Sequence, residues 1–212
     1  VSGTEHARDL AAPPAMLLGD VIYVRRESLR RLLWERIEEW NWKRGAGPMQ
    51  RALAPYGFER DALAALEAMT DHEIESAILH ELGECQAGRR LGDAWNALLT
   101  AISATRAELV ARAVRDHLAD SLTTLPTLLE RDDTASLDFY FANYRGMRRE
   151  LYPELLDAYR NWREGGPAAP LRDAVAAGRE RWEEAAARLL ALYREHGENI
   201  APLVENAVQG KT

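Results

Sequence analysis

Two pairs of polar residues stand out because each lies at the edge of a predicted apolar helix stripe. Glu81 and Glu84 form the first pair, and His117 and Asp120 form the second, each with i, i+3 spacing. Residues three apart lie on the same face of a helix, so each pair is expected to point in one direction. We expect the two pairs to face a shared polar hollow between two neighbouring helices.

A metal ion is the first chemistry that such a hollow suggests. A carboxylate taken out of water without a partner costs several kcal/mol, so buried acids must be neutralised. Carboxylates and neutral imidazoles suit Fe, Mn or Zn, and helix bundles present them at i, i+3 spacing. The candidate ligands are Glu81, Glu84, His117, Asp120 and His80. The leading expectation is therefore a carboxylate and histidine site that binds a divalent metal and could support redox or hydrolytic chemistry.

Known metal motifs are missing from this stretch, and two other arrangements would also neutralise the acids. The Glu-x-x-His pairs of di-iron bundles and the His-Glu-x-x-His motif are both absent. One alternative is mutual hydrogen bonding, in which a protonated carboxyl beside His117 forms an acid/base pair. The other is a set of arginine salt bridges, for which the candidates are Arg112, Arg115, Arg145, Arg148 and Arg149. Arginine pairing favours a different function, a non-enzymatic interaction or scaffold domain whose long last helix forms a homodimer.

Residues 136–151, SLDFYFANYRGMRREL, make up a second dense stretch. Three aromatic residues at helical spacing in it predict core packing. They are Tyr140, Phe141 and Tyr144. Tyr144, with Asp138, could also be an outer partner of the site, and Arg148 with Arg149 could hold a carboxylate or phosphate. We therefore predict that Tyr144 and Arg148 contact a cofactor or small-molecule ligand.

The helix that must carry Glu81 and Glu84 is predicted over residues 70–88. Thr70 and Glu73 form a capping box at its start, which separates it from a preceding helix over residues 58–69. Helical spacing predicts one buried apolar line that contains Glu81. Its apolar members are Ile74, Ile78, Leu82 and Cys85.

A second capping box, Thr105 with Glu108, begins the helix that must carry His117 and Asp120, and this helix is predicted to end before Pro126. Apolar periodicity predicts further helices. They cover residues 27–43, 48–54, 91–102, 136–144, 147–162, 170–196 and 200–208. No stretch shows sustained alternation, and residues 16–24 are either extended or a first helical turn. The expected fold is an all-α, single-domain bundle of about seven to nine helices.

Domain organisation follows from the proline and glycine positions. Residues 1–14, which end in Pro13-Pro14, are predicted to be an extended tail, and residues 15–212 a helical domain. The Gly165-Gly166-Pro167 turn marks a possible boundary within that domain.

Composition excludes several functional classes. The net charge is −7, from 27 basic and 34 acidic residues, and no helix face is dominated by arginine. Nucleic-acid binding is therefore not expected. The apolar run over residues 15–24 is too short to cross a membrane, and Glu5 and Asp9 do not fit a signal sequence. A single cysteine, Cys85, rules out an internal disulfide, so we expect a cytoplasmic protein with a buried thiol.

Overall fold

The structure is a computed structural model that describes residues 12–43 and 45–209, and the prediction of an all-α, multi-helix fold is confirmed. Eight helices in the described part have nine or more residues: α1 (Arg26–Lys43), α3 (Ala62–Leu91), α4 (Asp93–Ala101), α5 (Arg106–Ala119), α7 (Thr134–Ala142), α9 (Pro153–Arg163), α10 (Ala169–His196) and α11 (Ala201–Gln209). Shorter helices are α2 (Pro48–Leu53), α6 (Leu125–Glu130) and α8 (Met147–Leu151). The predicted tail falls mostly on residues 1–11, which lie outside the described residues.

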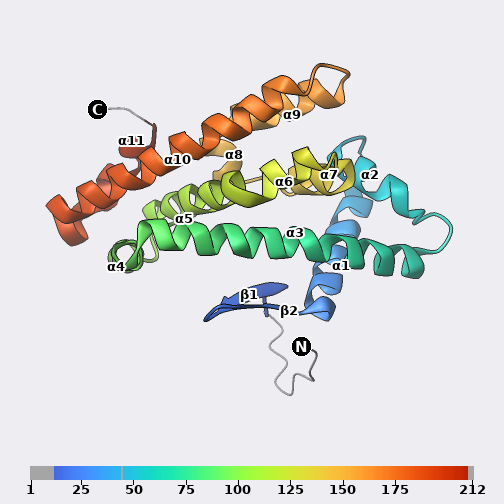
Figure 1. The fold of residues 1–212 in the computed structure, drawn as a ribbon, viewed down its shortest axis with the longest axis horizontal. Coiled ribbons are helices and arrows are strands. Elements are labelled where there is room, and N and C mark those ends of the chain that lie inside the picture. The colour runs from blue at the N-terminus through green and yellow to red at the C-terminus, as the bar shows by residue number, and fades with distance from the viewer. Residues whose placement is uncertain (1–11, 44, 210–212) are drawn as a thin grey trace.

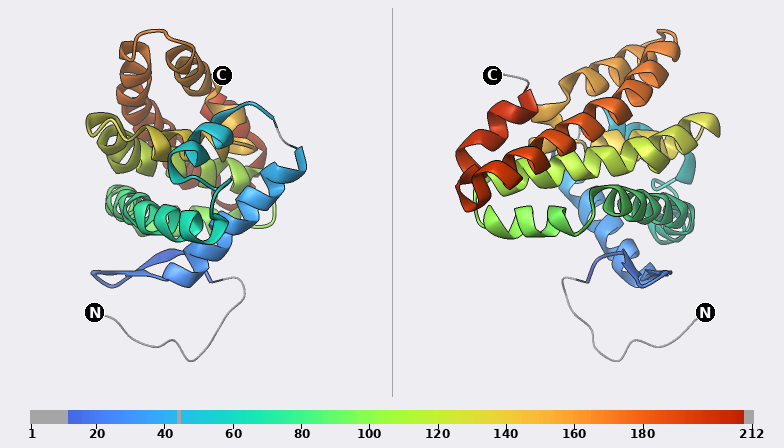
Figure 2. Two further views of the ribbon diagram at one scale, coloured as in Figure 1. Left: turned by 90° about the vertical axis from the view of Figure 1, so that its right-hand side faces the viewer. Right: turned by 60° about the vertical axis from the view of Figure 1, so that its left-hand side comes forward.

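The long helices are stacked in layers (Figure 1). Helix α5 packs between α3 and α10, and α9 packs along α10. The other side of α3 is covered by α1, which crosses it, and by a small hairpin near the N-terminus (Figure 2). Helix α3 therefore separates the hairpin from the main helical core. None of the described helices is both long and apolar enough to cross a membrane.

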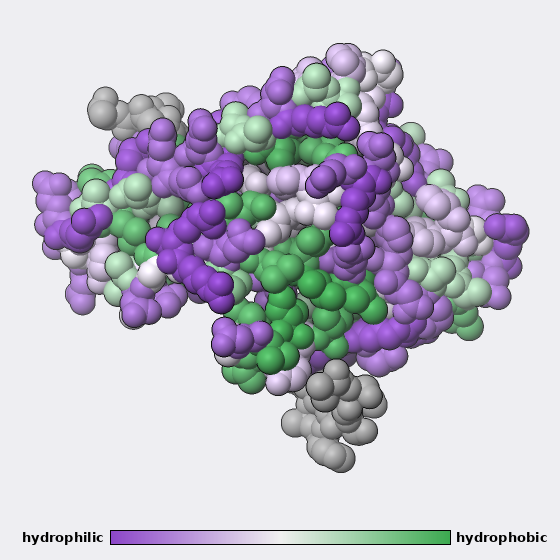
Figure 3. All heavy atoms as spheres, viewed as in Figure 1, coloured by the Kyte–Doolittle hydropathy of each residue, from purple (hydrophilic) through white to green (hydrophobic). Residues whose placement is uncertain are grey.

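Residues 16–24, which the sequence left open between an extended piece and a first helical turn, are extended and form most of a hairpin. Strands β1 (Ala15–Leu18) and β2 (Val21–Val24) pair antiparallel around Gly19, whose φ of 60° suits a tight hairpin turn. Each strand has only four residues, which is too short for alternation to be visible in the sequence. Leu18 and Val21 are exposed, as is Leu82 on α3, and apolar atoms gather over these elements in Figure 3.

Helix α3 is continuous, so the predicted break at Thr70 is wrong. Asp61 caps the helix instead, by accepting hydrogen bonds from the Leu63 and Ala64 backbone N–H groups. Thr70 is buried within the helix, where its hydroxyl donates to the Leu66 carbonyl. The Thr-x-x-Glu pattern thus occurs inside a helix, where a capping box cannot form.

The most closely packed face of α3 also differs from the predicted apolar line. Leu82 is 41% exposed, whereas the neighbouring Gly83 is buried against α5. A Cβ atom at Gly83 would lie only 2.3 Å from the Ala119 carbonyl oxygen. Small residues therefore mark the contact between α3 and α5, because they let the two backbones approach closely.

A π-helical segment, η2 (Asp120–Thr124), joins α5 to α6 and corrects the predicted helix end before Pro126. In this segment the Leu125 N–H donates to the Asp120 carbonyl, five residues earlier. Pro126 has no N–H and cannot continue an α-helical pattern, and the wider turn lets the chain run on into α6. Thr123 fastens the segment to α3, since its hydroxyl donates to the Leu79 carbonyl at 2.7 Å.

Candidate functional site

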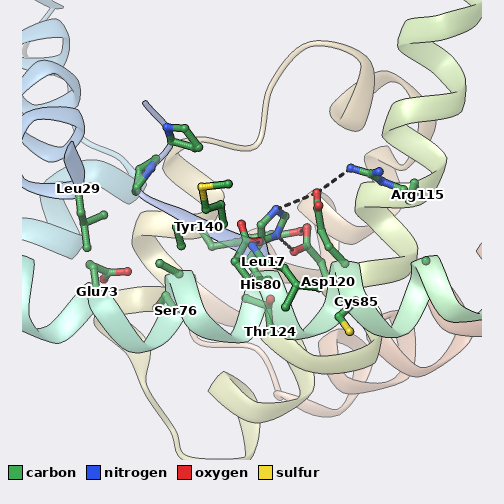
Figure 4. Close-up of a pocket in the computed structure, with 18 of the residues that line it drawn as sticks. Leu17, Leu29, Glu73, Ser76, His80, Cys85, Arg115, Asp120, Thr124 and Tyr140 are labelled. Carbon is green, nitrogen blue, oxygen red and sulfur yellow. Dashed lines mark hydrogen bonds and ion pairs between the residues drawn. The ribbon is translucent and has the colours of Figure 1, made fainter. Parts of the chain in front are cut away.

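A cavity of about 1240 Å³ lies between the hairpin, α1, α3 and the segment from η2 to α8. One face of α3 forms a wall of this cavity (Figure 4). That face carries Glu73, Ser76, Ala77, His80 and Glu84. Much of the remaining lining is apolar and comes from Met16, Leu17, Leu29, Leu128 and Phe139.

Asp120 is the centre of the polar wall. Its side chain is buried, and both carboxylate oxygens accept hydrogen bonds. Oδ1 accepts from His80 Nδ1 at 3.0 Å, and Oδ2 accepts from the Tyr140 hydroxyl at 3.0 Å and from Arg148 Nη2. Arg148 Nη2 also donates to the Tyr140 hydroxyl, at 2.5 Å. Side chains from α3, η2, α7 and α8 thus meet at one carboxylate. We call Asp120 and its three partners, His80, Tyr140 and Arg148, the Asp120 cluster.

A second acid extends the cluster towards α5. The Glu84 carboxylate accepts from Arg115 Nη2 at 3.0 Å and lies 3.6 Å from His80 Nε2. A chain of interactions thus runs from Arg115 through Glu84 and His80 to Asp120, and Figure 4 labels Arg115, His80 and Asp120. His80 is therefore placed between two carboxylates.

These contacts fix the charges of the cluster. Burial lowers the pKa of His80, but its interactions with Asp120 and Glu84 outweigh burial and raise that pKa to about 10. Burial raises the pKa of Asp120, but the Arg148 charge and the His80 hydrogen bond hold it well below its usual range. At neutral pH the cluster therefore contains an imidazolium and a carboxylate, and neither is a free base.

The other end of the same α3 face carries Glu73, which the capping-box interpretation placed at a helix start. Glu73 is 3% exposed, and its carboxyl accepts a hydrogen bond from Ser136 Oγ at 2.8 Å. Burial raises the pKa of Glu73. Glu73 and His80 are seven residues apart, about 10 Å along the helix axis. Their i, i+7 spacing was a signal in the sequence that both face the same way.

His117 lies apart from the cavity, contrary to the shared hollow that we expected. Its ring stacks on Trp182, with ring centres 4.5 Å apart, and Nε2 donates to the Arg148 backbone carbonyl at 2.9 Å. Burial, together with the Arg148 charge, lowers the pKa of His117 to about 3. A neutral His117 thus positions the backbone of the residue that holds Asp120.

Two other predicted site residues, Glu81 and Tyr144, also have structural partners. Glu81 lines the cavity, and its Oε2 accepts from the Leu17 backbone N–H of the hairpin at 2.9 Å. Tyr144 is buried behind Arg148, and its hydroxyl donates to the Tyr152 carbonyl at 2.9 Å. Arg149 is exposed.

The cavity therefore brings together some of the predicted residues and leaves out others. Those that line it are His80, Glu81, Glu84, Asp120 and Arg148; His117 and Tyr144 lie in the core behind them. Sequence reasoning assigned Tyr140 to core packing, although its hydroxyl is part of the Asp120 cluster. Within the described residues, no group of three or more His, Cys, Asp or Glu side chains is arranged to hold a metal ion, so the expected metal stays a prediction.

Comparison with known proteins identifies a family whose function is unknown. Residues 30–211 match a family of unknown function, described as the DUF6866 C-terminal domain. No curated protein and no solved structure matches the chain. The match contains the whole Asp120 cluster, whereas the hairpin lies before it.

Proposed function

The chain belongs to the DUF6866 C-terminal domain family, whose function is unknown, and we propose from its site that it binds a small amphipathic organic molecule in the cavity beside α3. The observation that carries this proposal is the cavity itself, in which one charged and hydrogen-bonding wall faces a largely apolar lining. Small-molecule sites are concave and mostly apolar, with a few fixed polar groups that orient the ligand.

The size of the cavity supports a ligand rather than a few waters. Its volume of about 1240 Å³ exceeds the ~300–1,000 Å³ that is common for small-molecule pockets. Its polar groups are held rigidly, because the Asp120 carboxylate bonds to side chains of three other elements. Rigid polar groups reduce the entropy lost when a ligand binds.

The protonation states favour recognition over proton transfer. A general base needs a pKa near the working pH, but His80 is held as an imidazolium and Asp120 as a fully hydrogen-bonded carboxylate. The metal-dependent redox or hydrolytic reaction stays a prediction. So does the scaffold function with its homodimer, although buried acids do pair with arginines, as between Asp120 and Arg148.

Cys85 provides a direct test, because it is the only cysteine of the chain and lines the cavity. We expect anilinonaphthalene sulfonate, an amphipathic fluorescent probe with an anionic sulfonate, to bind with one-to-one stoichiometry and to slow the reaction of Cys85 with a maleimide. Ala77→Trp would place an indole in the cavity and should weaken probe binding by roughly tenfold or more, equivalent to ~1.4 kcal/mol.

Ala68→Trp is the matched control, since Ala68 is an exposed residue of the same helix and does not line the cavity. It should leave probe affinity and Cys85 labelling unchanged. Thermal unfolding of both variants establishes that they are folded. Equal probe binding by wild type and Ala77→Trp would show that the cavity is not the binding site.

A further inference from the structure

We propose that the ligand carries a carboxylate or phosphate headgroup, which binds beside His80 between Arg115 and Arg148. This inference rests on the proposed function and adds the chemical class of the ligand. It depends on the charges that line one end of the cavity and on hydrogen-bond donors that the protein leaves unused.

Three cationic side chains gather at this end of the cavity. Three cations, His80, Arg115 and Arg148, meet two acids, Glu84 and Asp120. The Asp120 side chain is only 2% exposed, whereas His80 is 37% exposed and both arginines are 25% exposed. Asp120 is therefore hidden beneath the cationic groups, whereas Glu84, at 29% exposed, lies at the cavity surface with them.

Three further acids lie near this end of the cavity, so the case for an anion rests on the unused donors described below. Asp116, on α5, interacts with Arg148 but does not line the cavity, and burial raises its pKa. Glu81 directs Oε2 to the Leu17 backbone N–H. Glu73 lies two helical turns from His80.

Both guanidinium groups keep an unused donor. Arg148 forms its side-chain hydrogen bonds to Asp120 and Tyr140 through Nη2 alone, and Arg115 contacts Glu84 through Nη2. In each arginine, Nη1 has no partner among the described residues, and it is not one of the fully buried atoms. Arginine N–H groups bind carboxylate and phosphate oxygens with particular strength, because the hydrogen bond is charge-assisted.

The remainder of the cavity defines the rest of the ligand. Apolar side chains from the hairpin, α1 and α7 line the space beyond the cluster, including Leu17, Leu29 and Phe139. The expected ligand is thus an apolar body with one acidic end, oriented along α3.

The experiment compares three probes of equal chain length: octanoate, octyl phosphate and octanamide. Binding is measured by calorimetry and by protection of Cys85 from maleimide. We expect octanoate or octyl phosphate to bind about tenfold or more tightly than octanamide, as one charge-assisted hydrogen bond implies. Whichever of the two acidic probes binds more tightly shows whether the ligand carries a carboxylate or a phosphate ester.

Arg115→Gln should reduce acid binding by about tenfold and leave octanamide binding unchanged. Arg112→Gln is the matched control, since Arg112 is an exposed residue of the same helix that pairs with Glu108. His80→Gln should independently weaken binding of the acidic probes, because Gln can still donate to Asp120 but has no charge.

Octanamide binding as tight as that of both acids would overturn the headgroup assignment, and so would an acid preference that survives Arg115→Gln and His80→Gln. Failure of all three probes to bind would overturn it as well. In each of these cases, the proposed binding of a small molecule in the cavity would still hold if the fluorescent probe binds and if Ala77→Trp weakens that binding. Loss of that sensitivity would instead remove the proposed function.

Discussion

Two histidines on neighbouring helices are driven to opposite protonation states by their surroundings. His80 lies between the Asp120 and Glu84 carboxylates, and its pKa rises to about 10. His117 is packed against Trp182 near the Arg148 guanidinium, and its pKa falls to about 3. Residue type alone therefore does not determine the role: one imidazole is a fixed cation and the other a neutral hydrogen-bond donor.

His117 predicts a specific loss of stability in acid. Its pKa is about 3 in the folded protein and 6.5 ordinarily, so below pH 6.5 the unfolded chain binds a proton that the folded protein does not. Stability should therefore fall as the pH drops from 6.5 towards 3. For this one residue the slope approaches ~1.4 kcal/mol per pH unit.

Urea unfolding at pH 7, 6, 5 and 4 measures this effect, with His117→Gln as the comparison. Gln can donate to the Arg148 carbonyl but does not titrate, so its stability should fall less steeply with acid. His80 contributes little to the change well below pH 6.5, because there it is protonated in the folded protein by its raised pKa and in the unfolded chain by its ordinary pKa; its contribution is lost as the pH rises from 6.5 towards 10. Parallel curves for the two proteins would contradict the assignment of a neutral, buried His117.

At the scale of elements, the close contact between α3 and η2 sets the distance from His80 to Asp120. Gly83→Ala would place a methyl group 2.3 Å from the Ala119 carbonyl and 2.5 Å from Thr123 Oγ1, so the two elements must separate. We expect a loss of about 1–3 kcal/mol or more in the free energy of unfolding. Gly88→Ala, on the same helix with open space around it, should instead stabilise by roughly 0.5–1 kcal/mol. Urea unfolding of both variants measures these changes in the free energy of unfolding. A Gly83→Ala protein as stable as wild type would contradict this close contact.

The same elements show what the sequence could and could not predict. Apolar periodicity was sufficient to predict the helical fold. The predicted cap at Thr105 is also present, and its hydroxyl oxygen accepts a hydrogen bond from the Glu108 N–H. The i, i+3 rule did not predict the partners of His117 and Asp120, because residues three apart still differ by about 60° around the helix: Asp120 bonds to His80 on α3, whereas His117 stacks on Trp182 of α10. Glu73 was misinterpreted because its partner, Ser136, is 63 residues away. Local spacing carries no information about such distant contacts.

At the scale of the whole molecule, one core extends across the possible boundary at residues 165–167. Leu155 and Tyr159 on α9 belong to the same buried cluster as Leu171 and Val175 on α10. A smaller cluster between α1, α2 and α3 is joined to this core by α3, which contributes buried residues to both.

We therefore expect one cooperative thermal transition, in which the calorimetric and van't Hoff enthalpies agree. For 212 residues the enthalpy should be roughly 150 kcal/mol near 60 °C, from ~0.7 kcal/mol per residue. Scanning calorimetry measures both quantities. Two resolved transitions would show that residues 165–167 do separate two folding units.

The widened turn at Asp120–Thr124 also bears on how such a protein can change over evolution. Successive helical residues are rotated by about 100°, so loss of one residue there would turn α6 by that angle relative to α5. Tyr140 and Arg148 follow α6 in the chain, and both would be displaced from the carboxylate that they share. Deletion of one residue among 121–123 would thus disassemble the Asp120 cluster while all four of its side chains remained encoded.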